Sequence, residues 1–216
     1  MNTILVTGAT GNLGRAVVAS LSAKGFKIKA TARALAKAVG VRHVVFISSL
    51  GVDAVEQAPL RQIERHLMAA GVNYTILRPN FFMENFSTGF LAPMVKKGAI
   101  YLAAGDGKTS FISVADIAAV AATAFQKSLV GKEYNLTGRE ALDHAAAASI
   151  ISKVTGKPIA YHPLTEEAML QGMRDNGLPE GAVQYASAVT KEVETVTGKR
   201  PRTFEAFVRE NATVWR

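Results

Sequence analysis

The chain has 216 residues, of which 49% are hydrophobic and 19% are charged, and it contains no cysteine. This length suits one domain, or one domain with a small lobe, that buries a substantial core. The lack of cysteine excludes disulfides and Cys-based metal sites, and no apolar run approaches the ~20 residues that span a bilayer. Because the first residues, "MNTILVTG", enter a strand directly and leave no room for a signal peptide, we expect a cytoplasmic protein.

The formal net charge is +8 at pH 7, which is compatible with a nucleic acid or a phosphate-bearing ligand. The basic residues are spread along the chain and form only short clusters, at 96–97 and 199–202. A dispersed excess of this kind is typical of a well-solvated surface rather than of a nucleic-acid interface. We therefore expect a small-molecule substrate, no nucleic-acid or membrane partner, and a monomer or homodimer.

Residues 3–33 have the pattern strand, glycine-rich turn, helix, glycine stop, strand. The turn holds Gly8, Gly11 and Gly14, and Gly25 is expected to end the helix. Such a turn needs glycine for its tight bend, for close approach of the backbone to a pyrophosphate, and for contact between helix and strand. The helix N-terminus then presents N–H groups and a positive dipole end to the phosphates. The alternative is a plain strand–helix turn that favours glycine.

This turn, "TGATGNLG", resembles the nucleotide-binding turn of the extended and atypical short-chain dehydrogenases. Later segments, "HVVFISSLG", "GVNYTILRPNFFMENF", "AAGDGKTSFISVADIAAVA", "EYNLTG" and "TGKRPRTFEAF", are similar to the NmrA-like family, and within it to NAD(P)H-dependent quinone oxidoreductases of type 2. The resemblance implies an α/β fold, a Rossmann-type doubly wound parallel sheet with a small C-terminal α/β lobe. Residues 1–86 would form the NAD(P)-binding core, and residues 87–216 would complete the sheet and form the substrate lobe of one functional domain.

Between the second expected strand, 27–33, and the third, 43–49, only nine residues are available. Parallel neighbours need a crossover, normally of a dozen or more residues. The resemblance implies a further helix, strand, helix and strand here, so roughly fifty residues are expected to be missing near 33/34. Shorter omissions are expected near 60/61 and 187/188. A genuine deletion is the alternative, and it would remove two strands from the fold.

The carboxyl ends of the strands are expected to carry the rest of the site, because ligands of doubly wound sheets bind there. Ser48 and Ser49 end one buried strand, although hydroxyls at this position also cap strands. "NFFMENF" follows the strand that Pro79 stops, and its aromatic rings and amides suit a flat ring, or else hinge packing between sheet and lobe. The cofactor contacts implied by turn, strand ends and resemblance are Thr7, Gly8, Ala9, Thr10, Gly11, Asn12, Leu13, Gly14, Arg33, Ser48, Ser49, Asn80, Phe81, Phe82, Met83, Glu84 and Asn85. The substrate contacts implied by the resemblance are Phe82, Met83 and Asn85.

The segment 98–125 predicts a hairpin and then a helix capped near Ser113, with Asp116 in its first turn. The hairpin resembles the one that lies beside the substrate cleft in the family. Residues 143–181 predict two helices around a short strand at 159–164. These elements would form the small lobe that closes one side of the cleft.

No catalytic residue can be assigned from the sequence. None of the five tyrosines is followed four residues later by a lysine, so the Tyr-x-x-x-Lys pair of ordinary short-chain dehydrogenases is missing. The four histidines lack metal-ligand spacing, and we expect no metal site. The resemblance implies hydride transfer from NADPH to a quinone-like acceptor, and quinone reduction is compatible with the missing proton donor. The alternatives are a non-catalytic NAD(P) sensor of the NmrA type, and an isomerase or epimerase.

The second strand ends in "ATAR", with Arg33 where NAD-specific proteins place an acidic residue for the ribose 2′-hydroxyl. A guanidinium can bind a 2′-phosphate through two charge-assisted hydrogen bonds. The sequence therefore predicts NADPH in preference to NADH, unless Arg33 is only a solvated strand-end residue.

Overall fold

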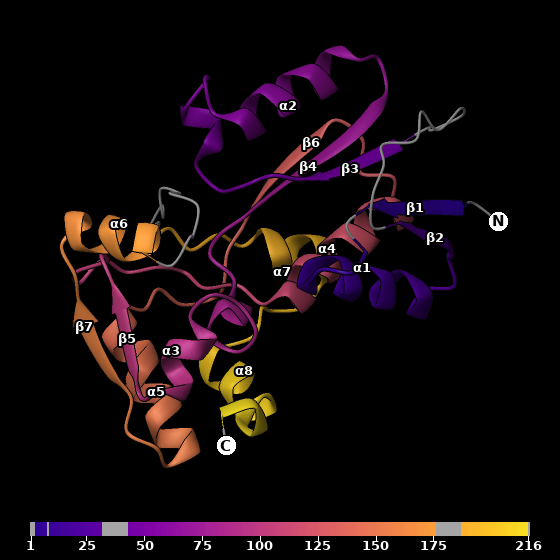
Figure 1. Ribbon diagram of the computed structural model, residues 1–216. Coiled ribbons are helices and arrows are strands. Elements are labelled where there is room, and N and C mark those ends of the chain that lie inside the picture. Colours follow the sequence, from indigo (N-terminus) through magenta and orange to yellow (C-terminus); the bar gives the residue numbers. More distant parts are fainter. Residues whose placement is uncertain (1–2, 8, 32–42, 176–186, 216) are drawn as a thin grey trace.

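The structure is a computed structural model that describes residues 3–7, 9–31, 43–175 and 187–215 (Figure 1). Its strands are β1 Thr3–Thr7, β2 Lys27–Thr31, β3 His43–Ile47, β4 Asn73–Pro79, β5 Ala99–Leu102, β6 Lys132–Leu136 and β7 Ala160–Pro163. Its helices are α1 Asn12–Ala23, α2 Pro59–Ala69, α3 Ala92–Lys96, α4 Val114–Gln126, α5 His144–Thr155, α6 Glu166–Asp175, α7 Glu192–Thr197 and α8 Phe204–Glu210. Every ladder between these strands is parallel, which confirms the predicted α/β class.

One part of the molecule, here called the sheet region, contains strands β1, β2, β3, β4 and β6 with helices α1, α2, α4 and α7. Strands β3, β4 and β6 form one parallel sheet in that order, and β1 pairs with β2 in another. Figure 1 shows α2 on one face of the β3–β4–β6 sheet and α4 on the other, with α1 and α7 packed against α4. Helices on both faces are the arrangement of a doubly wound fold, as the sequence predicted.

The sheet region is divided between β1 and β3. The described residues contain no ladder between these two strands, although a single doubly wound sheet was expected. Side chains of both strands, Ile4 and Val6 from β1 and Val45 and Ile47 from β3, still contribute to one hydrophobic cluster. The two sheets therefore share a core without sharing backbone hydrogen bonds.

The C-terminal lobe is built around the parallel pair β5–β7 with α3, α5 and α8 beside it. Its core is aromatic, and Phe86, Phe111 and Phe204 are fully buried there. The indole N–H of Trp215 donates to the carbonyl of Phe86 at 2.8 Å, which holds the end of the described chain against this core. The two helices around a short strand that the sequence predicted are α5, β7 and α6.

The hairpin expected after residue 99 does not form. Strand β5 pairs instead with β7, which lies sixty residues further along the chain, in the register Ile100↔Tyr161. The segment after β5 turns back toward the core, where Phe111 and Ile112 are buried and Ile112 forms an isolated bridge with Phe82. Burial of these two apolar residues competes with local pairing, because a hairpin partner would leave them more exposed.

Several local signals are confirmed. Gly25 has a φ of 78°, which only glycine adopts without strain, and it follows the last residues of α1. The Ser113 side chain accepts a hydrogen bond from the backbone N–H of Ala115, so it caps α4, and Asp116 lies in the first turn.

The structure describes two of the three places where residues are expected to be missing. The join at 33/34 lies outside the described residues. The hydrogen bond from the Gln62 N–H to the Ala58 carbonyl crosses 60/61 at 3.0 Å, and residues 187 and 188 are both among the described residues. The missing segments stay a prediction about the length of the natural polypeptide.

Candidate cofactor and acceptor site

The N-terminus of α1 is open to a phosphate. Gly11 is the N-cap residue, no side chain caps this helix end, and the first turn carries no acidic residue. The first backbone bond of the helix runs from the Arg15 N–H to the Gly11 carbonyl at 2.9 Å. N–H groups at such an end and the helix dipole together favour an anion, so these residues fit the pyrophosphate of a dinucleotide.

The other residues of this turn are placed as follows. Ala9 and Leu13 are half-buried against the core, and Thr10 is exposed. Gly14 lies in the first turn of α1 and is half-buried. The amide of Asn12 donates to the Thr88 hydroxyl at 2.8 Å, which joins the turn to the loop after β4. Two predicted contacts, Gly8 and Arg33, lie outside the described residues, and of Thr7 only the backbone is described.

The amide of Asn80 holds the chain at the end of β4. Its Nδ2 donates to the Ser110 hydroxyl at 2.8 Å, and its Oδ1 accepts from the Phe81 N–H at 2.9 Å. The Ser110 hydroxyl in turn donates to the carbonyl of Ala188 at 2.7 Å. This side chain therefore organises the carboxyl edge of the sheet, and a direct contact between Asn80 and the cofactor stays a prediction.

Glu84 and Met83 face the protein. The Glu84 carboxylate accepts from the Ser113 hydroxyl at 3.1 Å and from the Val114 N–H at 3.0 Å, so it sits at the N-terminus of α4. Burial raises the pKa of Glu84, while the Val114 and Ser113 hydrogen bonds act in the opposite direction. The Met83 side chain is 1% exposed and belongs to the aromatic core. In this structure the Met83 side chain is too buried to make the predicted contact with substrate.

Phe82 and Asn85 are half-buried. The Phe82 side chain packs against the hydrophobic cluster of the sheet region, and its carbonyl accepts from the Asn85 N–H at 3.1 Å. The Asn85 carbonyl accepts from the Leu91 N–H at 3.0 Å. Both residues therefore shape the loop after β4, and their role toward cofactor or substrate stays a prediction.

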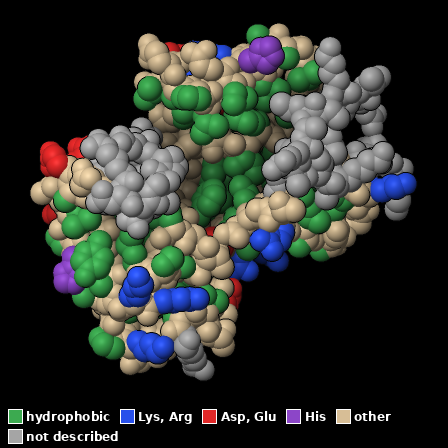
Figure 2. All heavy atoms as spheres, in the orientation of Figure 1, with side chains coloured by type: hydrophobic (Ala, Val, Ile, Leu, Met, Phe, Trp, Pro, Cys, Tyr) green, Lys and Arg blue, Asp and Glu red, His purple; other side chains and the backbone are tan. Residues whose placement is uncertain are grey.

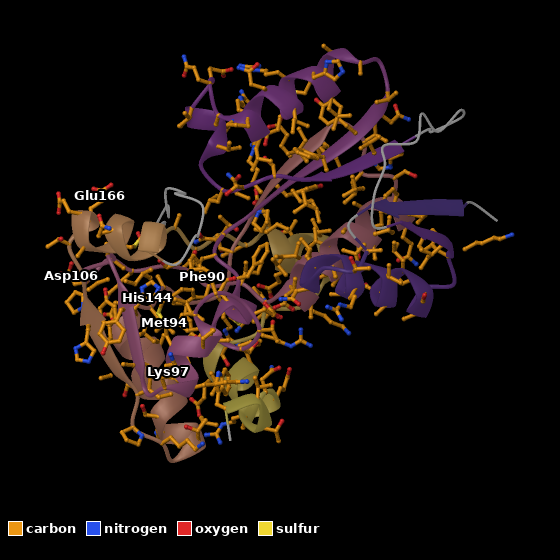
Figure 3. The ribbon with its side chains drawn as sticks, viewed as in Figure 1. Phe90, Met94, Lys97, Asp106, His144 and Glu166 are labelled. Carbon is orange, nitrogen blue, oxygen red and sulfur yellow. The ribbon has the colours of Figure 1, made fainter. Side chains whose placement is uncertain are left out.

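Phe81 connects the core to the surface. Its ring lies 5.7 Å from the ring of Phe111 and 6.0 Å from that of His144 inside the lobe, and 5.9 Å from that of Phe90. Phe90 is 44% exposed. In Figure 3 Phe90 lies closer to the middle of the molecule than Met94 and His144 do. Sequence reasoning missed Phe90, although a further aromatic residue at the end of "FFMENFSTGF" was the available signal.

His144 is not a titrating group near pH 7. Its ring is fully buried among the lobe aromatics, and burial lowers its pKa to about 4. The ring is therefore neutral at pH 7 and enclosed by protein.

The two serines at the end of β3 differ in their surroundings. Ser48 is 7% exposed and its N–H donates to the Leu77 carbonyl at 2.7 Å. Its hydroxyl lies beside Glu64, with no partner at hydrogen-bonding geometry among the described residues. Ser49 is half-buried, and its carbonyl accepts from the Val52 N–H at 3.3 Å. Ser48 thus faces a network of buried charges, and the cofactor contacts of both serines stay predictions.

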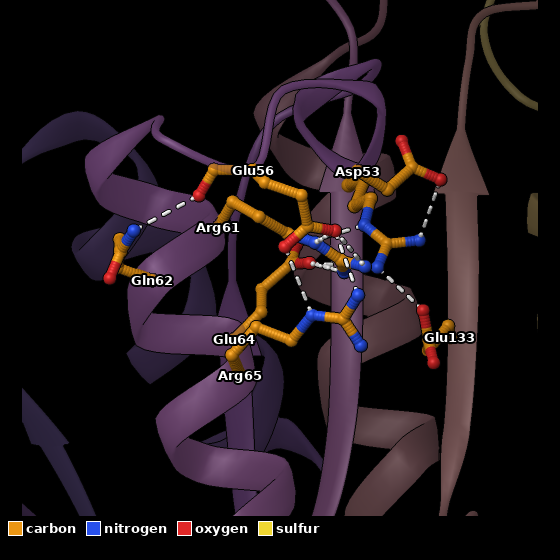
Figure 4. A network of polar contacts seen from close by, with 8 residues as sticks. Asp53, Glu56, Arg61, Gln62, Glu64, Arg65 and Glu133 are labelled. Atoms are coloured by element: carbon orange, nitrogen blue, oxygen red, sulfur yellow. Dashed lines mark hydrogen bonds and ion pairs between the residues drawn. The ribbon is translucent and has the colours of Figure 1, made fainter.

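That network centres on Arg78 of β4 and Glu64 of α2 (Figure 4). Arg78 donates to both carboxylate oxygens of Glu64, at 2.9 and 2.8 Å, and to Glu133 of β6 at 2.5 Å. Arg61 donates to Glu64 at 2.8 Å. Burial alone would raise the pKa of Glu64, but the hydrogen bonds from Arg78 and Arg61, with Ser48 nearby, lower it to about 2. The network ties α2 to β4 and β6 just before the loop that carries Phe81.

The described residues contain no group of three His, Asp or Glu side chains that could hold a metal ion. No helix among them combines the length and apolar character that crossing a membrane requires.

Comparison with known proteins identifies relatives. The NmrA-like family model matches residues 32–207. Agroclavine dehydrogenase from Claviceps fusiformis is 38% identical over 193 residues, which cover 82% of this chain and 66% of that protein. NAD(P)H azoreductase from Xenophilus azovorans is 30% identical over 218 residues, with 92% and 75% covered. The chain thus spans about two thirds to three quarters of the length of these two relatives.

Solved structures share the fold. A new type of NADPH-dependent quinone oxidoreductase from Escherichia coli superimposes with a TM-score of 0.75 at 23% identity, covering 97% of this chain and 99% of that one. Triphenylmethane reductase from Citrobacter, complexed with NADP(H), gives 0.76 at 20% identity, covering 97% and 100%. With a matching family model over most of the chain and relatives at 30% identity or more, this chain belongs to the NmrA-like family.

Proposed function

We propose that this protein is an NADPH-dependent oxidoreductase that reduces flat, quinone-like acceptors. The observation that carries the proposal is the hydrogen bond from Asn12 to Thr88, which joins the open N-terminus of α1 to the loop that bears aromatic side chains. A phosphate-binding turn and an aromatic surface meet at the edge where ligands of doubly wound sheets bind. The names of the relatives, which include a dehydrogenase, an azoreductase and a quinone oxidoreductase, support the same reaction class.

In this proposal residues 9–14 hold the pyrophosphate through backbone N–H groups of the α1 N-terminus. Arg33 binds the 2′-phosphate that distinguishes NADPH from NADH. Bound NADPH supplies a hydride, which together with one proton from solvent converts a quinone to its hydroquinone and leaves NADP⁺.

The chain contributes position rather than acid–base chemistry. The Glu84 carboxylate caps α4 and the His144 ring is enclosed in the lobe, so neither carries a proton to an acceptor. Among the described residues after β4, the side chains left for an acceptor are half-buried or exposed and mainly aromatic. Contact between acceptor and cofactor in the correct geometry is the main contribution that hydride transfer to a quinone requires. We place the protein in the cytoplasm as a monomer or homodimer.

The test is oxidation of NADPH by a simple benzoquinone, followed by loss of NADPH absorbance. We expect turnover, and we expect Gly11→Val to abolish NADPH binding and turnover while the fold is retained, because a side chain there blocks backbone approach. Ala19→Val is the matched control, since it adds the same side chain to the exposed face of α1. NADPH binding without turnover by any quinone would favour a sensor of the NmrA type. Unchanged NADPH affinity in Gly11→Val would refute the nucleotide site.

A further inference from the structure

Residues 84–91, here called the positioning loop, are held tightly by their own backbone. The N–H groups of Thr88 and Gly89 donate to the Glu84 carbonyl at 2.8 and 2.9 Å, and the Leu91 N–H donates to the Asn85 carbonyl at 3.0 Å. A Cβ at Gly89 would lie 2.7 Å from both the Cα and the Oδ1 of Asn85. The close turn therefore requires glycine, and it fixes the direction in which the next residue, Phe90, leaves the loop.

The positioning loop is also anchored from outside at several points. The Glu84 carboxylate binds the N-terminus of α4, Phe86 is buried in the lobe core, and the Thr88 hydroxyl accepts from Asn12. These contacts come from the lobe, from the sheet region and from the glycine turn. A loop held on three sides presents its side chains with little conformational freedom.

Phe90 is the exposed end of an aromatic series. Its ring packs in a T-shaped arrangement on Phe81, with 5.9 Å between centroids, and Phe81 packs on Phe111 of the core in the same way. Phe90 is 44% exposed, so it is also partly open to solvent. Figure 2 shows a hollow in the middle of the molecule, with hydrophobic side chains on its floor. A rigid, half-exposed ring can stack against a flat ligand at low entropic cost.

We propose that Phe90 is a specificity-determining residue for the acceptor, and that the bond between Thr88 and Asn12 sets its distance from the cofactor turn. This inference rests on the proposed function and refines it, because it names flat aromatic acceptors with extended rings as the preferred substrate class. A fused bicyclic quinone covers more of the Phe90 ring than a single-ring quinone does. The preference between the two is therefore expected to depend on this side chain.

The experiment compares Phe90→Ala with the unmutated protein for a naphthoquinone and a benzoquinone, with NADPH as donor. Loss of one aromatic contact corresponds to about a 3- to 10-fold rise in KM for the naphthoquinone. We expect a smaller rise for the benzoquinone and no change in NADPH affinity. Tyr101→Ala is the matched control, because Tyr101 is a surface aromatic of nearly equal exposure, 47%, on β5.

A second variant tests whether the bond between Thr88 and Asn12 positions Phe90. Thr88→Val removes the acceptor of the Asn12 hydrogen bond and keeps the shape of the side chain. We expect kcat to fall several-fold while the KM for the naphthoquinone and the affinity for NADPH stay within about twofold, since positioning affects the reaction step more than binding.

Binding of the naphthoquinone in the presence of NADP⁺, measured by calorimetry, decides the role of Phe90 independently of turnover. Weaker binding by Phe90→Ala and unchanged binding by Tyr101→Ala support it. Equal binding and equal KM in Phe90→Ala and the unmutated protein would overturn it, as would an equal loss in Tyr101→Ala. If the unmutated protein reduces no quinone, the proposed function fails, while the binding comparison still tests Phe90.

Discussion

Strands β3 and β4 are neighbours in one sheet, yet they are buried to different degrees. The last five residues of β4, 75–79, are buried, whereas all five residues of β3 are only half-buried. Strand β4 pairs on both sides, with β3 and with β6, and β3 pairs with β4 alone among the described residues. The run Val44–Ile47 contains no charge or proline of the kind that protects an edge strand. Its sequence suits an inner strand, and its place in the structure is an edge.

The same contrast extends to β1, which pairs only with β2 in the described residues although it contributes to the same core as β3. Two apolar strands with one partner each, joined by a shared core, are what remains when strands between them are absent. The comparison supports the omission that the short connection after Arg33 predicts. It also distinguishes the part of the sheet around Arg78, where β4 pairs on both sides, from the separate pair β1–β2.

The largest expected effect concerns the chain near 33/34, between β2 and β3. We predict that the natural polypeptide has a mass well above the 23.0 kDa of these 216 residues, because a parallel crossover and its strands need more chain near 33/34. The mass spectrum of the intact protein, isolated from its source, measures this directly. A mass of 23.0 kDa would establish a genuine deletion and an edge position for β3.

The next largest effect concerns the charged network around Arg78. Glu64→Gln leaves the Arg78 guanidinium buried without its bidentate partner, and we expect a loss of about 3–5 kcal/mol in the free energy of unfolding. Urea denaturation measures it. Glu205→Gln is the control, since it breaks an exposed pair with Arg209 and should leave stability nearly unchanged. Similar midpoints for both variants would mean that the network does not hold the sheet together.

The network also predicts a pH dependence. The folded pKa of Glu64, about 2, lies below its ordinary value of 4.5, so its stabilising contribution is complete above pH 4.5 and is lost as the pH falls toward 2. His144 lowers stability at higher pH values than Glu64 does, between about pH 6.5 and 4. In this range the unfolded ring gains a proton, while the buried ring, with a pKa of about 4, stays neutral. Urea midpoints across this range should fall in both windows for the unmutated protein. Glu64→Gln should lose only the lower window, and an unaltered profile in that variant would contradict the assignment.

The smallest effect concerns the choice of cofactor by Arg33. Arg33→Ala should weaken NADPH binding by about 1.5–3 kcal/mol, the contribution of a hydrogen bond to a charged group, and should affect NADH far less. Fluorescence titration with both cofactors measures the difference. Lys27→Ala, at the exposed start of β2, is the matched control. Equal weakening of both cofactors, or tighter NADH than NADPH binding by the unmutated protein, would remove Arg33 from the site.

The sequence alone determined the elements whose signals are local. The first strand, the glycine turn, α1 and its stop at Gly25 could be predicted because glycine conformations and apolar periodicity act over a few residues. The cap at Ser113 and the stop of β4 at Pro79 follow the same logic. The family resemblance also came from such short segments, and the family model bears it out.

Only the tertiary structure decided what each side chain of the candidate site faces. Met83 and Glu84 belong to a segment that predicts ligand contact, but one packs in the lobe core and the other caps α4. Phe90, which no motif marks, is an exposed aromatic residue of the loop after β4, and β5 pairs with β7 rather than with its neighbour in sequence. The physical reason is common to these cases: burial and strand pairing depend on residues far apart in the chain, whereas caps, turns and periodicity depend on residues close together.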